Sequence, residues 1–508
     1  MNIRHTNRLM TSIDCPALRP WQARCIEQAL QTLSETHPHF LCQATPGAGK
    51  MLMAAVLADE LLQNGGVELV VYLGPTTAVV ERARATLEQV TNLGMSGRLG
   101  TGGVALTYHA LHHRLTELQQ LCQHKRVLLI WDESHHAAGQ TDAPNSANQW
   151  GLALMALERQ VHYTLALSGT PWRTDGSCLP LLRYMEAPDE DDSSGSDAAS
   201  TSQKQLQPDF VYTLTEAIQD GICRHPHFQL IDNRSIRLTR HHPRSGRRES
   251  RRFASIPHLL RHPAMHYSSL LRHEAPMRHL LDQGCEQLAK LRQRDPDAAG
   301  LVVASDILHA EAIAEALEDR HQSVCLVTSK AANAQARLLA FGDATTEWIV
   351  SVGMVSEGVD IPRLRVCCYL SQVRTEQHFR QVLGRIIRRE GDDDAECFLY
   401  ALNEPHLRHY ARRIAEDLPE DLATVSFPMP ETASDPAAPS DHEASTPPLA
   451  PQDAAPPDDS AEATRTGQGG EPSTEVTFDV AGSAEHLDPD VAFSRAFFER
   501  LVALRLLP

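Results

Sequence analysis

The sequence contains no long uncharged apolar run, so we expect no segment of its 508 residues to cross a bilayer. Its N-terminus, MNIRHTNRLM, lacks the apolar core of a signal peptide, and we expect a cytoplasmic protein. The eleven cysteines form no CxxC pair and have no neighbouring histidine cluster at zinc spacing, which argues against a zinc module. Cys367 and Cys368 lie in an apolar run, and we predict that both are reduced core residues.

Basic residues are fewer than acidic ones, and the net charge of −18 by itself argues against a nucleic-acid partner. The excess of acidic residues is local, because residues 431–490 contain 14 acids and one base, Arg465. That leaves a net charge of about −5 for the rest of the chain. The same stretch has almost no large apolar residues, so we expect it to be disordered. A second acidic stretch, 186–207, is expected to be flexible.

The segment from Gln43 to Met51, QATPGAGKM, has the composition of a phosphate-binding loop. The apolar run 39–44 precedes it and the helical pattern 50–63 follows it, so we predict strand, loop and helix. Glycines let backbone N–H groups curl around phosphate oxygens, a lysine reaches the outer phosphates, and the helix N-terminus adds its positive end. The residues expected to bind a nucleoside triphosphate here are Thr45, Pro46, Gly47, Ala48, Gly49, Lys50 and Met51.

Met51 stands where a Ser or Thr hydroxyl usually binds the magnesium ion. Its thioether is only a weak acceptor. A water held by Asp132, or an oxygen such as that of Thr45, could replace the missing ligand, and hydrolysis would then be slow but measurable. A nucleotide-binding scaffold with little or no turnover is the alternative.

Asp132 and Glu133 follow the apolar run 127–131, which we predict as a strand buried in a parallel sheet. Ligands bind at the carboxyl ends of such strands. The two carboxylates form a candidate metal site, in which Asp132 serves Mg²⁺ and Glu133 orients or deprotonates the attacking water. Two adjacent acids are more often a solvated turn, but the phosphate loop favours the catalytic interpretation.

The segment QVLGRIIRR, residues 381–389, places Gln381, Arg385 and Arg388 at helical spacing on one face. An arginine presented to a γ-phosphate stabilises the transition state of phosphoryl transfer. Taken in isolation, these arginines would be a solvated basic helix face.

In their order along the chain, these segments resemble the motifs of superfamily 2 helicases and translocases of the DEAD/DEAH type, and the resemblance covers roughly residues 16 to 405. LRPWQ (18–22) is similar to the element that reads adenine, QATPGAGKM to motif I and DESH (132–135) to motif II. The remaining matches are GPTTAVVE (74–81), ALTYHAL (105–111), SGTPWR (168–173), LVVASD (301–306), SVGMVSEGVDIP (351–362) and QVLGRIIR (381–388), which resemble motifs Ia, Ib, III, IV, V and VI.

The resemblance implies an α/β fold with two tandem RecA-like parallel-sheet domains, ATP and Mg²⁺ between them, and movement along a strand. It implies adenine contacts by Arg19 and Gln22, and nucleotide contacts by Gly358 and Asp360 of motif V. The catalytic residues implied are Lys50, Asp132, Glu133, Gln381, Arg385 and Arg388. The expected parts are lobe 1 (1–185), an acidic linker (186–208), a basic inter-lobe connection (209–285), lobe 2 (286–425), a disordered acidic tail (426–490) and an amphipathic helix (491–508).

The basic connection makes nucleic acid the expected partner. Residues 224–278 contain 12 arginines, no lysine and three acids, and the cluster 241–252 concentrates the charge. A solvated basic loop is the alternative. The segment 209–226 resembles the one that joins the motor lobes of DNA-repair and restriction-type translocases, which favours DNA over RNA.

The last 18 residues, 491–508, turn apolar again and are predicted to form an amphipathic helix. This segment either docks on its own core or binds a protein partner together with the acidic tail. We favour docking on the core, because an exposed Phe and Leu face favours aggregation. A role as a subunit of a larger assembly remains the second alternative.

Overall fold

The computed structural model describes residues 17–98, 100–133, 149–157, 160–169, 184–186, 204–241, 248–328, 333–353, 361–391, 394–416 and 490–501. All of them belong to one compact unit. In these ranges no helix is both long and apolar enough to cross a membrane.

The first lobe is built on a six-stranded sheet whose strand pairs are all parallel, in the order β3-β2-β4-β5-β1-β8. Its strands are β1 (His39–Ala44), β2 (Leu69–Gly74), β3 (Gly103–Thr107), β4 (Val127–Asp132), β5 (Tyr163–Ser168) and β8 (Phe210–Tyr212). The helices are α1 (Pro20–Thr32), α2 (Lys50–Gln63), α3 (Thr77–Thr91), α4 (Tyr108–His124) and α5 (Gln149–Leu157).

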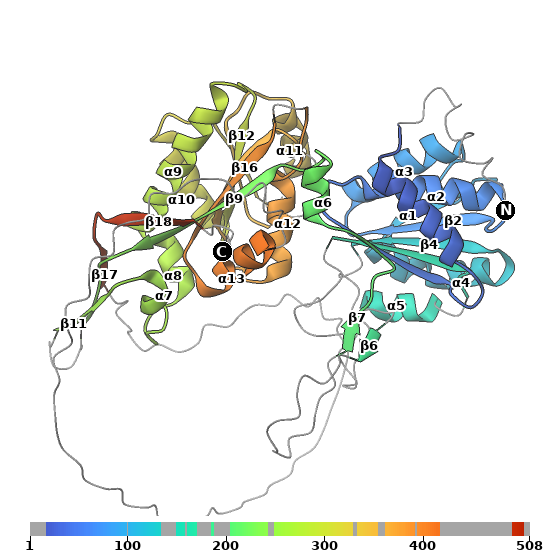
Figure 1. Cartoon of the computed structure of the whole chain (residues 1–508), viewed down its shortest axis with the longest axis horizontal. Coiled ribbons are helices and arrows are strands. Elements are labelled where there is room, and N and C mark those ends of the chain that lie inside the picture. The colour runs from blue at the N-terminus through green and yellow to red at the C-terminus, as the bar shows by residue number, and fades with distance from the viewer. Residues whose placement is uncertain are drawn as a thin grey trace, which may run out of the picture. The chain divides into compact units, whose positions relative to one another are not determined.

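Helices cover both faces of this sheet, as Figure 1 shows. In β2, Val70 and Tyr72 pack in the cluster that contains α1, α2 and α3, whereas Val71 and Leu73 pack in the cluster that contains α4 and α5. Successive strand residues point to opposite faces, so strands buried on both sides are apolar throughout. This burial explains why the predicted strands at 39–44 and 127–131 appeared as continuous apolar runs.

The second lobe is a seven-stranded sheet in the order β13-β14-β12-β15-β16-β9-β18, in which only β18 runs antiparallel to its neighbour. Its strands are β9 (His225–Asn233), β12 (Ala299–Ala304), β13 (Val324–Val327), β14 (Trp348–Ser351), β15 (Leu364–Leu370), β16 (Glu396–Leu402) and β18 (Phe497–Leu501). Its helices are α8 (Tyr267–Arg272), α9 (Glu274–Arg292), α10 (Ile307–Glu318), α11 (Ala334–Gly342), α12 (Glu376–Ile386) and α13 (Pro405–Glu416). Cys367 and Cys368 are fully buried free thiols in β15, as predicted.

The expected connection, residues 209–285, is divided between the two sheets. Its strand β8 pairs with β1, and its strand β9 pairs with β16. The short helices α6 (Leu214–Gln219) and α7 (Ile256–Leu259) also belong to it. Within the expected acidic linker and at its edge, β6 (Tyr184–Glu186) and β7 (Lys204–Leu206) form an antiparallel pair, and residues 187–203 lie outside the described residues.

Part of the connection's positive charge is structural. Arg224 is 1% exposed, and its Nε donates to Oδ1 of Asp394 at 2.6 Å. Its other nitrogens donate to the backbone carbonyls of Pro362, Leu364 and Ile386, all at 2.7 Å. This buried ion pair joins the start of β9 to β15 and to the end of α12, so Arg224 is not available to a phosphate.

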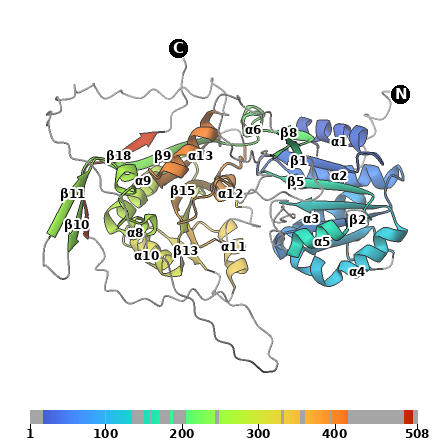
Figure 2. The ribbon, with the colours of Figure 1, turned by 90° about the horizontal axis from the view of Figure 1, so that it is seen from below.

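Several exposed arginines of the connection lie on a small sheet, β11-β10-β17, which we call the basic sheet (Figure 2). It consists of β10 (Ile236–His241), β11 (Arg248–Phe253) and β17 (Asp490–Phe493). Arg237 stands directly opposite Arg252, and both are exposed. Like charges in directly opposed positions repel, so this face favours an anionic partner.

The predicted helix at 491–508 is wrong where the structure describes it. Residues 490–501 form β17 and β18, which add antiparallel to the free edges of β10 and β9. Aromatic residues suit strands, and an open sheet edge offers unpaired N–H and C=O groups. The rings of Phe493 and Phe497 lie 5.7 Å apart, and Phe497 stacks on His279 at 4.8 Å. Docking on the protein's own core, the outcome we favoured, is confirmed for this segment, while the acidic tail up to residue 489 lies outside the described residues.

Candidate nucleotide site

The predicted phosphate loop joins β1 to α2 and has the backbone that its glycines allow. Gly47 has a φ of 81° and Gly49 a φ of 93°, in the left-handed region that side chains with a β-carbon rarely enter. Gly49 caps α2, which begins at Lys50. Nζ of Lys50 donates to the carbonyl of Ala44 at 3.0 Å, so the ammonium folds back over the loop.

Arg19 and Gln22, expected to contact adenine, hold the loop in place. A nitrogen of the Arg19 guanidinium donates to the carbonyl of Ala48, and Nε2 of Gln22 donates to the carbonyl of Gly49, both at 2.8 Å. Gln22 is 1% exposed, and its Oε1 also accepts from the backbone N–H of Arg19 at 2.8 Å. The start of α1 is thereby fixed to two carbonyls of the loop.

Asp132 and Glu133 lie at the carboxyl end of β4, as predicted. The Tyr72 hydroxyl donates to Oδ2 of Asp132 at 2.9 Å, and the Tyr108 hydroxyl donates to its backbone carbonyl at 2.7 Å. Burial, with a smaller contribution from the Glu133 charge, raises the pKa of Asp132 to about 6. Glu133 has a φ of 53°, and left-handed residues other than glycine are uncommon and concentrate at functional sites.

The second lobe contributes α12 and the residues after it. Gln381 and Arg385 lie in the helix, but α12 ends at Ile386, so the prediction that Arg388 shares their helical face is wrong. Arg388 lies in an isolated bridge with Cys223 instead, and its side chain runs against the phosphate loop. A β-carbon on Gly47 would come within 2.9 Å of Cγ of Arg388.

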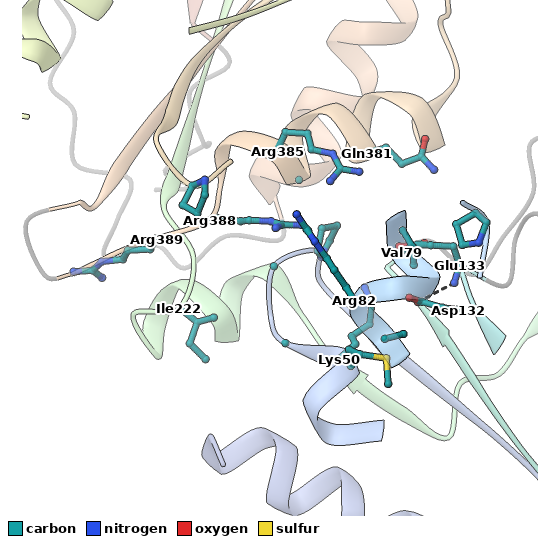
Figure 3. A pocket seen from close by; sticks show the side chains of 18 of the residues that line it. Lys50, Val79, Arg82, Asp132, Glu133, Ile222, Gln381, Arg385, Arg388 and Arg389 are labelled. Carbon is teal, nitrogen blue, oxygen red and sulfur yellow. Dashed lines mark hydrogen bonds between the residues drawn. The ribbon is translucent and has the colours of Figure 1, made fainter. Parts of the chain in front are cut away.

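These groups line one cavity of about 400 Å³ (Figure 3). The lining includes these predicted site residues: Arg19, Pro46, Gly47, Gly49, Lys50, Met51, Asp132, Glu133, Gln381, Arg385 and Arg388. Gln22, Thr45 and Ala48 are not among the lining residues, and Gly358 and Asp360 lie outside the described residues. Burial lowers the pKa of Arg388 to about 10, with a further contribution from the charge of Arg82.

Arg82 of α3 and Gly384 of α12 line the cavity and were missed as site residues. Gly384 lies inside the segment QVLGRIIR, and its close approach to Pro46 is the reason for a glycine there. Arg82 immediately follows the segment that resembles motif Ia, so neither motif spacing nor composition singles it out.

The donor atoms of this cavity fit a magnesium ion that is shared with a phosphate. In the described ranges no three His, Cys, Asp or Glu side chains come together to hold a metal by themselves. Magnesium is bound through one or two carboxylates, waters and substrate phosphates, and Asp132 offers one such carboxylate. The half-buried Met51 side chain lines the cavity and packs against the core, so the hydroxyl of the usual loop is replaced by a thioether.

Residues 16–173 match the model of a family described as Type III restriction enzyme, res subunit. That range contains α1, the phosphate loop, Arg82 and the acid pair. The match therefore covers most of the described first lobe, and it is to this family that the first lobe is similar.

Proteins similar to this chain include two uncharacterized mycobacterial proteins. One, from Mycobacterium tuberculosis, is 30% identical over 397 residues, which cover 76% of this chain and 61% of the relative. The other, from Mycobacterium leprae, is 30% identical and covers 76% and 62% respectively. The chain thus spans about 61% of the length of the curated relatives it matches.

Among solved structures, a fragment assigned as the HsdR subunit of a type I restriction enzyme from Vibrio vulnificus aligns with a TM-score of 0.50. It is 16% identical and covers 78% of this chain and 67% of that chain. This likeness concerns the fold, and it confirms the expected α/β class with two tandem RecA-like domains.

Proposed function

We propose that this chain is an ATP-dependent nucleic-acid helicase or translocase, with DNA favoured over RNA. The observation that carries the proposal is the joint lining of one cavity by Lys50, Glu133 and Arg388, which come from a phosphate loop, from the end of β4 and from the second lobe. A phosphoryl-transfer site needs these three elements: a triphosphate anchor, a carboxylate near the attacking water, and a cation for the transferred group.

In the proposed reaction, Glu133 accepts a proton from the attacking water. The water oxygen forms a bond to the γ-phosphorus while the bond from that phosphorus to the bridging oxygen breaks, which releases ADP and inorganic phosphate. Lys50, Arg385 and Arg388 stabilise the charge on the phosphate oxygens. Asp132 would hold the magnesium ion, which when bound neutralises charge on the outer phosphates. Gln381, beside Arg385, would orient the γ-phosphate or the water.

Hydrolysis in this scheme requires both lobes, because the arginines come from one lobe and the carboxylates from the other. Approach of α12 to the phosphate loop would complete the site, and product release would let it open. Repeated opening and closing on a bound strand gives movement along it. Contacts with strand phosphates would be largely independent of sequence.

Nucleic acid as the partner is supported by the basic sheet. Its exposed arginines include Arg237, Arg248, Arg251 and Arg252. Phosphate contacts by arginine release counterions, so such a surface supplies affinity without base recognition. The family description of the first lobe, a restriction enzyme subunit, favours DNA.

The experiment that tests the function is an ATPase assay of the purified chain with single-stranded DNA, duplex DNA and RNA compared at one salt concentration. We expect nucleic acid to stimulate phosphate release, and DNA to stimulate it more strongly than RNA. Stimulation by RNA alone would contradict the DNA preference. Nucleotide binding without release under any condition would favour the scaffold alternative, for which the thioether of Met51 in the cavity is the specific observation.

A further inference from the structure

Arg82 places a cation in the nucleotide cavity from an unexpected element. It lies in the second turn of α3, directly after the segment that resembles motif Ia. In the structure its side chain lines the cavity with Lys50 and Arg388 (Figure 3). Lys50 comes from the phosphate loop and Arg388 from lobe 2, so Arg82 reaches the cavity from a third direction.

No anion in the described part of the chain neutralises the Arg82 guanidinium. Among the residues that the structure describes, none forms an ion pair or a hydrogen bond with the guanidinium, and only the backbone carbonyl of Arg82 accepts a side-chain hydrogen bond, from the Thr86 hydroxyl at 3.0 Å. Its neighbour on the helix differs, because Arg84 pairs with Glu81 at 3.0 Å and donates to the carbonyl of Ala105 at 3.3 Å. Arg82 therefore remains available to a ligand, whereas Arg84 is engaged in the protein.

The charge balance of the cavity shows what kind of ligand it would take. Among the described residues, its lining contains the cations Arg19, Lys50, Arg82, Arg385, Arg388 and Arg389. The described carboxylates of the lining are those of Asp132, Glu133 and Glu390. Desolvation lowers the pKa of Arg82, and burial, followed by the Arg82 charge, lowers the pKa of Arg388. Two cations that repel each other across a cavity are both stabilised by an anion placed between them.

We propose that Arg82 binds the γ-phosphate of the nucleotide from the lobe 1 side, opposite Arg388. The assignment rests on the proposed function, because it takes the ligand to be a nucleoside triphosphate. Arg385 and Arg388 are the residues expected at the γ-phosphate, and Arg82 reaches toward Arg388 in the same cavity (Figure 3). A ligand phosphate held by Arg388 would therefore also meet Arg82. Arg82 thus supplies positive charge to the outer phosphates beside a loop that lacks the usual hydroxyl.

This position makes Arg82 a discriminator between tri- and diphosphate. A hydrogen bond to a charged group contributes on a scale that corresponds to about 10- to 100-fold in affinity. We expect Arg82→Gln to weaken binding of a non-hydrolysable ATP analogue by about that factor and to leave ADP affinity within about twofold. Arg82→Lys keeps the charge and should recover part of the loss.

The experiment is equilibrium binding of a fluorescent non-hydrolysable ATP analogue and of fluorescent ADP, in magnesium and without nucleic acid. The matched control is Arg84→Gln, which removes the same charge from the same helix outside the cavity and should change neither affinity. The assignment would be overturned if Arg82→Gln weakened the binding of both nucleotides equally, or if it left the affinity for the ATP analogue unchanged. Failure of the parent protein to bind either nucleotide would instead contradict the proposed function itself.

A contact of Arg82 with the strand is the competing role, because Arg82 is an exposed arginine of α3 and exposed arginines can contact strand phosphates. The same variants separate the two roles through the salt dependence of single-stranded DNA binding in the absence of nucleotide. If Arg82 binds the γ-phosphate, the salt dependence of DNA binding should have the same slope in Arg82→Gln as in Arg84→Gln. A slope reduced by about one in Arg82→Gln alone would assign the side chain to the strand and overturn the proposal.

Discussion

Gly384 of α12 lies against Pro46 of the phosphate loop so closely that a β-carbon on it would stand 2.6 Å from Cβ of Pro46. Non-bonded carbon atoms prefer separations of about 3.5 to 4.0 Å, so even one methyl group would force the two apart. Gly384 precedes Arg385, which lines the cavity. The absence of a side chain at residue 384 thus sets how near the second-lobe arginine comes to the loop.

Gly384→Ala is therefore expected to lower the ATPase rate by about 100-fold, because displacements of about 1 Å can cost that much in catalysis. Nucleotide affinity should fall less, since the loop and Lys50 belong to the first lobe. The matched control is Gly342→Ala at the end of α11, where a β-carbon meets nothing within 4 Å. Steady-state phosphate release and nucleotide binding measure the two effects. A Gly384→Ala protein as fast as the Gly342→Ala protein would show that this contact does not position Arg385.

Lys50→Ala and Glu133→Gln should fail in different ways, because in the proposed reaction Lys50 binds phosphate while Glu133 serves the attacking water. We expect Lys50→Ala to weaken ATP affinity and Glu133→Gln to bind ATP with turnover reduced by about 100-fold or more. Nucleotide binding and single-turnover hydrolysis measure both. Full turnover in both variants would exclude the cavity as an ATPase site.

Much of the site could be predicted from the sequence, because its parts are local. The glycines at 47 and 49 have the positive φ that their loop requires, and the acid pair lies at the predicted strand end. Arg388 was placed correctly in the cavity but for the wrong reason. The helical spacing in the sequence continues past Ile386, but the helix ends there and the chain enters the bridge with Cys223. Sequence spacing cannot show that tertiary contact.

The remaining errors come from long-range pairing. Residues 491–501 have a pattern that suits a helix or a strand, and the decision depends on two sheet edges more than 200 positions away, at β9 and β10. The role of Arg224 was hidden in the same way, since a basic-cluster count cannot show that Asp394 neutralises it. Local patterns predicted elements and loops, and tertiary partners decided the rest.

The basic sheet predicts a salt-dependent contribution to nucleic-acid binding. Arg248→Gln together with Arg252→Gln should weaken single-stranded DNA binding and reduce the slope of log K against log salt by about 1 to 2. ATP affinity should not change, because neither residue lines the cavity. The double variant Arg98→Gln, Arg412→Gln removes two exposed arginines elsewhere and serves as the charge control. If both double variants bind alike across the salt titration, the basic sheet is a solvated surface.

We expect the folded protein to lose stability in mild acid because of His309. Burial lowers its pKa to about 4 from an ordinary value of 6.5, with a further contribution from the nearby Arg272 charge. Below pH 6.5 the unfolded chain binds a proton there that the folded chain does not, so the free energy of unfolding falls as the pH drops from about 6.5 to 4, by at most about 1.4 kcal/mol per pH unit. Urea unfolding between pH 7.5 and 5 measures the slope. His309→Gln should be less sensitive to pH than the parent, and an identical slope would contradict this assignment.

Met51 decides between an ATPase and a nucleotide-binding scaffold. Its thioether lines the cavity where a hydroxyl would bind magnesium, and Thr45, the nearby oxygen that could compensate, is 8% exposed and does not line the cavity. A water held by Asp132 is therefore left to replace the missing magnesium ligand. We expect magnesium to bind more weakly in this way than with a direct hydroxyl ligand. We expect a low ATPase rate in the parent, and Met51→Thr should raise it and lower the magnesium concentration for half-maximal activity. A magnesium titration of both proteins at saturating ATP and DNA checks this, with Met53→Thr as a control for replacing a buried methionine of the same helix. If the parent already hydrolyses ATP rapidly and Met51→Thr changes neither the rate nor the magnesium requirement, the thioether has no effect on turnover. If neither protein hydrolyses ATP, the result favours the scaffold alternative.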